Sequence, residues 1–252
     1  GVDFISVICA NFSGEVFWRV KENTAGSQGQ GAIIERTLAL LRQAVWAGSN
    51  DCVGCDRLLG IAMGVPGLVE QATGTLLFAP NLKWQDVPVQ AILAEHFPGV
   101  PLFVDNEANM AALGEYLFGA ARGANEVLYL SAGVGVGGAV VRNGQLVRGT
   151  TGFAAEFGHM TLDPDGLPCN CGNRGCWETL VSQSAVFRLI RAAIAGGKSS
   201  RLVLMTGGDL ERLSIPLVVE AAQQGDEVAL SALATVGRYL GIGIASLINA
   251  FN

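Results

Sequence analysis

Apolar residues near the start of the chain occur in short runs, first with the spacing of strands and then with that of a helix. Residues 4–12 and 15–20 are two apolar segments joined at Ser13-Gly14, a pattern that predicts a β-hairpin. Residues 30–47 then place apolar side chains three and four positions apart and end at a glycine. This spacing predicts an amphipathic helix.

The next part of the chain predicts buried strands with a helix between them. Residues 59–65 form an apolar run stopped by a proline-glycine turn, and residues 102–105 form a second run. Between them, Asp86 is placed to cap a helix that reaches Phe97, with Pro88 in its first turn, where proline is tolerated. Alternating strands and helices are typical of an α/β fold.

A second hairpin is predicted near the middle of the chain. Residues 107–123 have helical periodicity, and residues 127–131 predict a strand. Asn143-Gly144 then lies between apolar segments, which is the strongest short signal for a hairpin turn. A hairpin, a helix and a strand therefore recur along the chain, which indicates two related lobes.

From about residue 182 the pattern is helical. Gly225-Asp226 interrupts it, with Asp226 placed as the cap of a last long helix. Gly241 and Gly243 lie inside that helix, where each costs roughly 1 kcal/mol relative to alanine. Such glycines indicate close helix packing.

The size of the chain also favours two lobes. Its 252 residues exceed an ordinary single domain, and with 50% hydrophobic and 15% charged residues it can bury a sizeable core. We expect an N-terminal lobe at 1–106 and a C-terminal lobe at 107–252, with a hinge near 105–110. Both ends of the chain look truncated.

The net charge and the lack of targeting signals limit which binding partners are expected. The net charge of −6 argues against unaided binding of nucleic acid or another polyanion. The sequence shows no signal peptide and, by inspection, no apolar stretch of membrane length. We therefore expect a cytoplasmic protein without a membrane partner.

One histidine and three cysteines lie close together in a chain that has only 2 histidines and 6 cysteines. They are His159, Cys169, Cys171 and Cys176. Zn²⁺ takes four ligands tetrahedrally, and thiolates and imidazole suit it, so this cluster predicts a closed, structural zinc site. The alternative is that the cysteines form a disulfide or fill the core.

The other cysteines are less informative. Cys52 and Cys55 form a CxxC in a polar stretch, which is compatible with a redox pair or half of a second metal site. An ordinary loop pair is the simpler interpretation, because no partner ligands lie nearby in sequence. Cys9 lies in an apolar strand and is expected in the core.

Polar residues gather at the ends of the predicted strands and around the cysteine cluster. They are Asn81, the run from Asp105 to Asn109, and the glutamates Glu156 and Glu178. Amides and carboxylates in such places can bind a polyhydroxylated small molecule. The simpler interpretations are that Asn81 and Asn109 cap turns and that Glu178 is an ordinary exposed residue.

His159 connects the two groups of residues. One ring nitrogen of a zinc-bound histidine coordinates the metal, and the other usually donates to a carboxylate or a ligand hydroxyl. We therefore expect the zinc to hold in place the loop that carries Glu156, His159 and Glu178.

Five stretches of the chain carry a family resemblance: GVPGLV at 64–69, PNLKW at 80–84, DNEANMAALGE at 105–115, GVGVGG at 133–138 and EFGHMTLDPDGLPCNCGNRGCWE at 156–178. In these stretches, and from end to end, the sequence resembles the ROK family of bacterial repressors and sugar kinases. It implies a two-lobed, actin-like (ribonuclease-H-like) α/β fold, each lobe a mixed sheet flanked by helices, with the zinc loop at 156–178. It also implies sugar contacts at Gly67, Asn106, Glu107, Glu156, His159 and Glu178.

The chain departs from the kinases of that family at two sites. In those kinases an aspartate acts as general base where this chain has Glu107, and displacing a base by about 1 Å can cost on the order of 100-fold in rate. Gly133, Gly135 and Gly137 remain as a degenerate phosphate loop, but Val134 stands where the kinases usually have threonine.

Two further departures concern ATP. The phosphate loop expected at the N-terminus is reduced to Gly1-Val2-Asp3, and the negative charge of Asp3 repels phosphate. The late glycine-rich segment that closes over adenosine in the family is not part of this chain.

These departures favour the repressor branch of the family. On this interpretation the chain is the sugar-sensing domain of a regulator that resembles xylose repressors. A monosaccharide binds in the cleft between the lobes, and lobe closure changes the spacing of the DNA-reading helices. We expect a homodimer or a dimer of dimers that contacts DNA only through an N-terminal helix-turn-helix absent from this chain.

Two other functions stay open. The chain can be an ATP-dependent, glucokinase-like sugar kinase that uses ATP and Mg²⁺, with Glu107 as the catalytic base. It can also be a sugar-binding module without a DNA partner. Xylose, glucose and glucosamine derivatives all remain candidate ligands.

Overall fold

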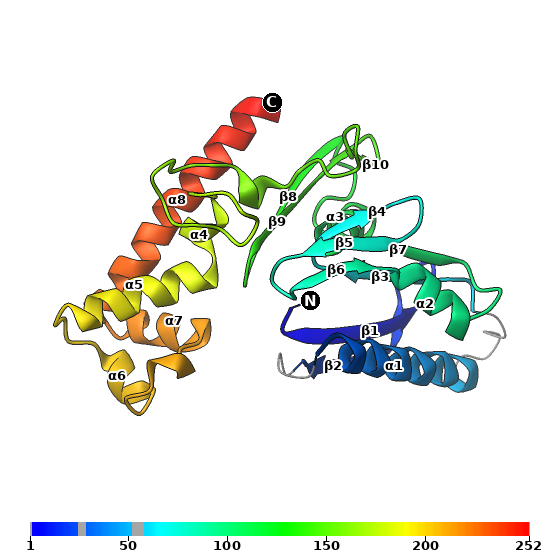
Figure 1. The fold of residues 1–252 in the computed structure, drawn as a ribbon, viewed down its shortest axis with the longest axis horizontal. Helices are drawn as coiled ribbons and strands as arrows, with labels where there is room; N and C mark the ends of the chain where they lie inside the picture. The colour runs from blue at the N-terminus through cyan, green and yellow to red at the C-terminus, as the bar shows by residue number, and fades with distance from the viewer. Residues whose placement is uncertain (1, 25–28, 52–57, 252) are drawn as a thin grey trace. The chain divides into compact units, whose positions relative to one another are not determined.

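The computed structural model describes residues 2–24, 29–51 and 58–251, so Cys52 and Cys55 lie outside the described residues. The chain forms two compact units (Figure 1). Unit 1 comprises Gly1–Tyr129 and Gly138–Ala155, and unit 2 comprises Leu130–Gly137 and Glu156–Asn252. The division at residue 106 and the hinge near 105–110 stay predictions.

The N-terminal hairpin and the helix after it are confirmed. Strand β1 (Phe4–Ala10) pairs antiparallel with β2 (Val16–Asn23), with Val7 opposite Val20. Helix α1 (Gly29–Asp51) packs against both strands. Its apolar stripe is what covers the hairpin.

The two buried strands are also confirmed, and they pair with each other. Strand β3 (Ile61–Val65) runs parallel to β7 (Leu102–Asn106), with Val65 opposite Asn106. Helix α3 (Glu107–Phe118) follows β7 directly and ends five residues before the predicted limit. Since the carboxyl ends of parallel strands meet at one sheet edge, the turn after β3 and the start of α3 lie together.

The segment between these strands differs from the prediction. It forms an antiparallel sheet of β4 (Leu68–Glu70), β5 (Thr75–Ala79) and β6 (Trp84–Val87), followed by α2 (Val89–His96). The expectation that Asp86 caps this helix was wrong, because Asp86 lies inside β6 with φ of 51°. Proline disfavours a helical conformation in the residue before it, so the helix starts only after Pro88.

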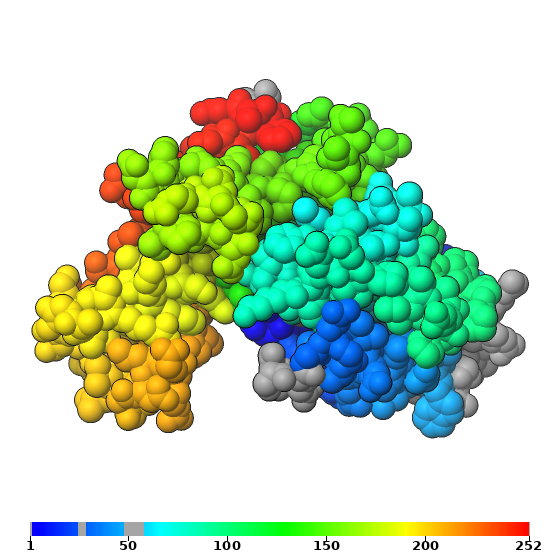
Figure 2. Space-filling model, viewed as in Figure 1, coloured from blue at the N-terminus to red at the C-terminus, as the bar shows by residue number. Residues whose placement is uncertain are grey.

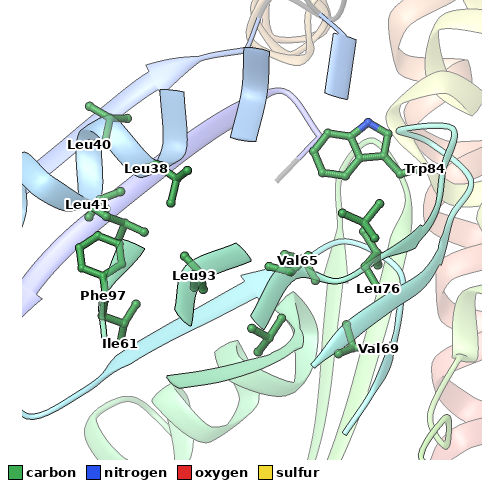
Figure 3. Close-up of a cluster of buried hydrophobic side chains, with 14 of the residues drawn as sticks. Leu38, Leu40, Leu41, Ile61, Val65, Val69, Leu76, Trp84, Leu93 and Phe97 are labelled. Carbon is green, nitrogen blue, oxygen red and sulfur yellow. The ribbon is translucent and has the colours of Figure 1, made fainter. Parts of the chain in front are cut away.

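One hydrophobic core holds the helices and strands of unit 1 together. Figure 3 shows Leu38 and Leu41 of α1, Leu93 of α2, and Ile61 and Val65 of β3 in this cluster. Helices α1 and α2 lie on the outside of the unit (Figure 2). Side chains alternate along β3, so Gly64 faces the other way, where an added Cβ would lie 3.1 Å from Glu107 Cα in α3.

The second hairpin is confirmed as well. Strands β8 (Glu126–Ala132), β9 (Val136–Arg142) and β10 (Gln145–Leu146) form a sheet in the order β10-β9-β8. At its turn Asn143 has φ of 51° and Gly144 has φ of 78°. Two central residues with positive φ are what a type I′ hairpin turn requires.

Unit 2 is mainly helical, as predicted. Its helices are η1 (Phe157–His159), α4 (Glu178–Val181), α5 (Gln183–Ala195), α6 (Arg201–Met205), η2 (Leu210–Arg212), α7 (Ile215–Gln223) and α8 (Glu227–Phe251). Helix α8 packs against α4, α5 and α7. The expected cap is present, because Asp226 Oδ1 accepts a hydrogen bond of 2.9 Å from Ala229 N.

Helix α8 corrects two expectations. It is long enough to cross a membrane, and a window of 18 residues within it reaches a mean hydropathy of 1.5, so the chain does contain an apolar stretch of membrane length. Length and composition do not separate such a helix from a core helix. Of its two interior glycines, only Gly243 marks close packing, against Trp177, whereas nothing lies within 4 Å of a Cβ placed at Gly241.

The cap at Asp226 gives a first prediction. Asp226 is 5% exposed, and its Oδ2 also accepts hydrogen bonds from Ser200 Oγ at 2.9 Å and Arg201 N at 2.6 Å. Asp226→Ala leaves these donors unpaired, so we expect the free energy of unfolding, measured with urea, to fall by about 2 kcal/mol. Asp209→Ala removes an exposed cap, whose donor is Glu211 N, and should lower the free energy of unfolding by a smaller amount.

The effect should depend on pH. Burial raises the pKa of Asp226, but hydrogen bonds from Ala229, Arg201 and Ser200 outweigh it and lower the pKa below its ordinary value. A lowered folded-state pKa contributes stability above the unfolded pKa of about 3.9, and this contribution is lost as pH falls through the folded value. The difference in the free energy of unfolding between wild type and Asp226→Ala should therefore become smaller below about pH 4. A gap that stays constant to pH 2 contradicts the role assigned to this carboxylate.

Candidate metal centre and ligand site

The predicted metal ligands converge in unit 2. One ligand atom from each of His159, Cys169, Cys171 and Cys176 lies within 4.8 Å of all the others. Cys171 Sγ and Cys176 Sγ are 3.7 Å apart, and so are Cys169 Sγ and His159 Nδ1. A tetrahedron with Zn–S bonds of about 2.3 Å has edges of about 3.8 Å, so the four atoms can hold a metal ion.

The separation between sulfurs also decides against a disulfide. A disulfide bond is about 2.05 Å long, and the three cysteines of the cluster are free thiols. Burial, together with the neighbouring Cys171 and Cys169 thiols, raises the pKa of Cys176 to about 12 in the metal-free chain. The pKa of Cys169 is raised too, mainly by burial.

The backbone around the cluster explains its glycines. Cys169 N donates to Asn173 O at 2.7 Å and Gly172 N to Cys169 O at 3.0 Å, which closes a turn around Cys171. Gly172 has φ of 94° and Gly175 has φ of 62°. A Cβ at Gly175 would lie 1.5 Å from Asp163 O, so only glycine fits there.

His159 has one nitrogen on each side of the site. Its Nδ1 faces the cysteines, and its Nε2 lies 4.0 Å from Glu156 Oε2. Burial raises the pKa of Glu156; the nearby His159 counteracts this shift, and the Glu178 carboxylate adds to it. Glu156, His159 and Glu178 therefore form one polar group beside the metal ligands.

Glu178 does more than line this group. Its Oε2 accepts a hydrogen bond of 2.8 Å from Val136 N, the first residue of β9 and part of the glycine loop at 133–138. In the same loop Gly133 N donates to Gly135 O at 2.8 Å. Two amides of the loop are thus engaged within the protein. The assignment of Gly133, Gly135 and Gly137 to a phosphate stays a prediction.

Trp177, between the last cysteine and Glu178, was not singled out from the sequence. It is fully buried, and its Nε1 donates to Tyr239 O in α8 at 3.0 Å. Its ring occupies the place of the missing Gly243 side chain, since a Cβ there would lie 2.2 Å from the indole. The metal loop is therefore anchored to α8. Nothing in the sequence linked Trp177 to Tyr239 or Gly243, because both lie more than 60 positions later in the chain.

A second polar group lies in unit 1, at the carboxyl ends of β3 and β7. Asn106 Nδ2 donates to Gly67 O at 2.9 Å, and Asn106 Oδ1 caps α3 by accepting from Ala108 N at 2.7 Å. Gly67 has φ of 120°, and a Cβ there would meet Phe78 O at 2.3 Å. Glu107 is the first residue of α3, and Asn81 lies in the turn between β5 and β6.

A buried ion pair next to this group was missed in the sequence. Asp105, 8% exposed, accepts from Arg148 Nη2 at 2.6 Å and from Asn109 Nδ2 at 2.9 Å. With its amide oxygen turned toward Arg148, Gln71 accepts from the same guanidinium at 2.8 to 2.9 Å. Asn109 thus supports Asp105, and the pair connects residues 43 positions apart, which sequence spacing does not reveal.

The structure thus brings together Gly67, Asn106 and Glu107 in unit 1, and Glu156, His159 and Glu178 in unit 2. Their role as sugar ligands stays a prediction, as does that of Asn81.

The structure thus combines an α/β fold with a Cys/His cluster that could hold a metal ion, on a loop next to Glu156 and Glu178. The sequence profile of the ROK family matches residues 37–252, and the chain belongs to that family. The resemblance seen in the sequence is confirmed.

The relatives of this chain include both repressors and sugar kinases. The chain is 38% identical over 252 residues to a putative xylose repressor from Caldicellulosiruptor sp. (strain Rt8B.4), covering 100% of this chain and 62% of the repressor. Among solved structures, a ROK family glucokinase from Streptomyces griseus in complex with glucose and AMPPNP has a TM-score of 0.83 at 32% identity, covering 100% of this chain and 78% of that one.

A ROK family transcriptional regulator, a homologue of the E. coli MLC protein, has a TM-score of 0.81 at 30% identity. That match covers 99% of this chain and 60% of the regulator. The fold is therefore shared by repressors and kinases alike. The chain spans less than two thirds of the length of the repressors that it matches.

The geometry of the cluster gives a second prediction. We expect the chain purified from zinc-containing medium to carry about one zinc ion, since all four ligand positions are supplied by protein. Cys176→Ser should lose most of this metal, measured by elemental analysis, and should unfold at a lower temperature because metal binding contributes to folding. Cys9→Ser, in β1 and outside the cluster, is the matched control and should keep its zinc. Equal metal content in both variants contradicts the assignment.

Proposed function

We propose that the chain is the sugar-sensing domain of a ROK-family transcriptional repressor. The observation that carries the sugar-binding part is the group of Glu156, His159 and Glu178, held beside the metal ligands with His159 Nε2 turned to Glu156. Two carboxylates and an imidazole N–H can bind neighbouring hydroxyl groups of one monosaccharide. Gly67, Asn81, Asn106 and Glu107 are proposed as further ligands from unit 1.

Zn²⁺ is the metal proposed for the cluster, with a structural role. Three thiolates and one imidazole fill a tetrahedral site and leave no position for a reacting water. Since Cys176 is followed directly by Trp177 and Glu178, the metal fixes the place of a proposed sugar ligand. The metal is thus proposed to act on sugar affinity through the loop.

The choice of a sensor over a kinase rests on the residues that a kinase needs. Glu107 stands where the family's kinases have an aspartate base, and its extra methylene displaces the carboxylate. The amide of Val136 is engaged by Glu178 and not available to a phosphate oxygen. Identity does not make this choice, since the chain is 38% identical both to a putative xylose repressor and to a glucokinase from Halalkalibacterium halodurans.

The proposed signal passes from sugar to DNA. A sugar that binds one arrangement of the lobes better than another shifts their populations, and in a dimer this alters the spacing of DNA-reading helices supplied by another part of the protein. The proposed setting is a cytoplasmic homodimer or dimer of dimers. A glucokinase-like activity with ATP and Mg²⁺ is the second candidate, favoured by the structural match to the glucokinase from Streptomyces griseus.

Sugar binding is tested with a panel of xylose, glucose and N-acetylglucosamine. A monosaccharide that binds the folded chain should raise its unfolding temperature. Glu156→Gln should weaken the affinity for that sugar about tenfold or more, as measured by calorimetry, because a hydrogen bond to a charged group contributes about 1.5–3 kcal/mol. Glu220→Gln, on the exposed side of α7, should leave the affinity unchanged. Equal affinities for both variants overturn the proposed site.

A coupled assay with ATP, Mg²⁺ and the same sugars separates sensor from kinase. The sensor proposal expects turnover far below about 1 s⁻¹, the lower end for kinases. Turnover above that value, abolished by Glu107→Gln, establishes the kinase instead. Sugar binding without turnover, in a protein whose gene encodes a helix-turn-helix before residue 1, supports the sensor.

A further inference from the structure

Arg148 forms a largely buried ion pair with Asp105 in unit 1. The two side chains are 25% and 11% exposed, whereas those of the surface pair Arg142 and Glu126 are 50% and 47% exposed. Removing one member of a buried pair leaves an uncompensated charge, so such a pair constrains its surroundings far more than a surface pair does. The pair therefore holds together two segments that lie 43 positions apart in the chain.

The Asp105 carboxylate passes this constraint on to the start of α3. Its Oδ2 accepts a hydrogen bond of 2.6 Å from Arg148 Nη2. Its Oδ1 accepts from Asn106 N at 2.7 Å and from Asn109 Nδ2 at 2.9 Å. Asn106 caps α3, and Glu107 is the first residue of that helix. The carboxylate thus fixes the backbone that carries both of these residues.

Gln71 holds the same guanidinium from a third segment, the turn between β4 and β5. With its amide oxygen turned toward Arg148, it accepts from Nε, Nη1 and Nη2 at 2.8 to 2.9 Å. A guanidinium is planar and its donors point in fixed directions. Contacts with both Asp105 and Gln71 therefore hold Arg148 in one orientation.

The backbone of Arg148 anchors the segment that leads to Glu156. Arg148 O accepts a hydrogen bond of 3.0 Å from Ala154 N, which closes the loop of residues 148–154. Ala155 follows with φ of 69°. This left-handed conformation is uncommon for residues other than glycine and persists only where the surrounding structure imposes it. The backbone that enters Glu156 therefore has a defined conformation.

We propose that Arg148 is a positioning residue for the proposed sugar ligands. Its guanidinium orients Asn106 and Glu107 through Asp105, and its carbonyl group orients the backbone that enters Glu156. This inference rests on the proposed function, because these are proposed ligands. Arg148 makes no contact with the sugar in this scheme, so its loss weakens binding through the geometry of other residues.

Hydrogen exchange followed by mass spectrometry tests the hold on both segments without any sugar. Arg148→Met removes the charge and every donor of the side chain. Amides of residues 104–110 and 150–156 should then exchange at least about tenfold faster than in the wild type. Amides of α2 in unit 1 and α5 in unit 2 should exchange as before. Arg142→Met, the matched control in the same unit, should change neither segment because its ion pair is exposed.

Sugar affinity tests the positioning itself. The ligand is whichever of xylose, glucose and N-acetylglucosamine binds the wild type, and affinity is measured by calorimetry. Arg148→Met should weaken binding about tenfold, the equivalent of one hydrogen bond to a charged group, while Arg142→Met should leave it unchanged.

A double variant separates positioning from stability. Asp105→Asn combined with Arg148→Met removes the uncompensated buried charge, so it should be more stable to urea than Arg148→Met alone. We expect its sugar affinity to stay as weak as that of Arg148→Met, since the link between the segments is still missing. A merely structural role predicts that affinity recovers together with stability. If Arg148→Met does not fold, the double variant carries both measurements.

Three results overturn the inference. They are unchanged exchange in both segments, an affinity equal to that of the wild type in Arg148→Met, and a return to wild-type affinity in the double variant. If none of the three sugars binds the wild type, the proposed function fails and with it the role of Arg148 in sugar binding. Faster exchange in both segments would still confirm that Arg148 holds them.

Discussion

The buried indole of Trp177 holds the metal loop, the glycine loop and the longest helix of unit 2 together. It has no exposed surface, its N–H is bound to Tyr239 O, and it fills the space that Gly243 leaves in α8. The residue before it is a metal ligand, and the residue after it holds the amide of Val136. A shift of this one side chain would displace both neighbours, so the packing of α8 and the position of Glu178 are a single constraint.

The Cys/His cluster and the indole hold the loop at two places. A metal ion at the four candidate ligands would crosslink the chain from His159 to Cys176, while Trp177 packs the end of the loop against α8. The loop itself has little regular structure, with only the isolated bridges Thr161 to Cys176 and Pro168 to Arg174. A segment of this kind gains most of its order from crosslinks, as small metal-binding modules do.

The sequence predicted features that depend on local chemistry. The metal ligands, the Asn143-Gly144 turn and the cap at Asp226 each rest on residue types whose preferences act over a few positions. The strands of the sheet β4-β5-β6 were not predicted, because polar residues such as Glu70 and Gln85 interrupt their apolar runs and only short turns separate them. Asp86 was placed as a helix cap since its residue type favours caps, but the proline two residues later decides where the helix starts.

Contacts between residues far apart in the chain were not predicted from the sequence. Nothing local indicates that Arg148 is the partner of Asp105, or that Trp177 requires a glycine 66 positions later in α8. Membrane-length apolarity in α8 was overlooked because glycines and a few polar residues divide the helix into shorter apolar runs. Such features emerge only when elements far apart in the chain are packed together.

The two hydrogen bonds of Asn106 have a consequence for recognition at the end of β7. With Nδ2 bound to Gly67 O and Oδ1 bound to Ala108 N, the amide is locked in one orientation and cannot exchange its ends. The Asn106 amide keeps one further N–H and one further oxygen lone pair, and the backbone fixes their directions before any ligand binds. A molecule bound there loses no rotamer freedom of this side chain, and one whose donor and acceptor are interchanged meets mismatched polarity at the same point. The fold thus sets the orientation of Asn106, and a hydroxyl group placed against it would have to match this fixed order of donor and acceptor.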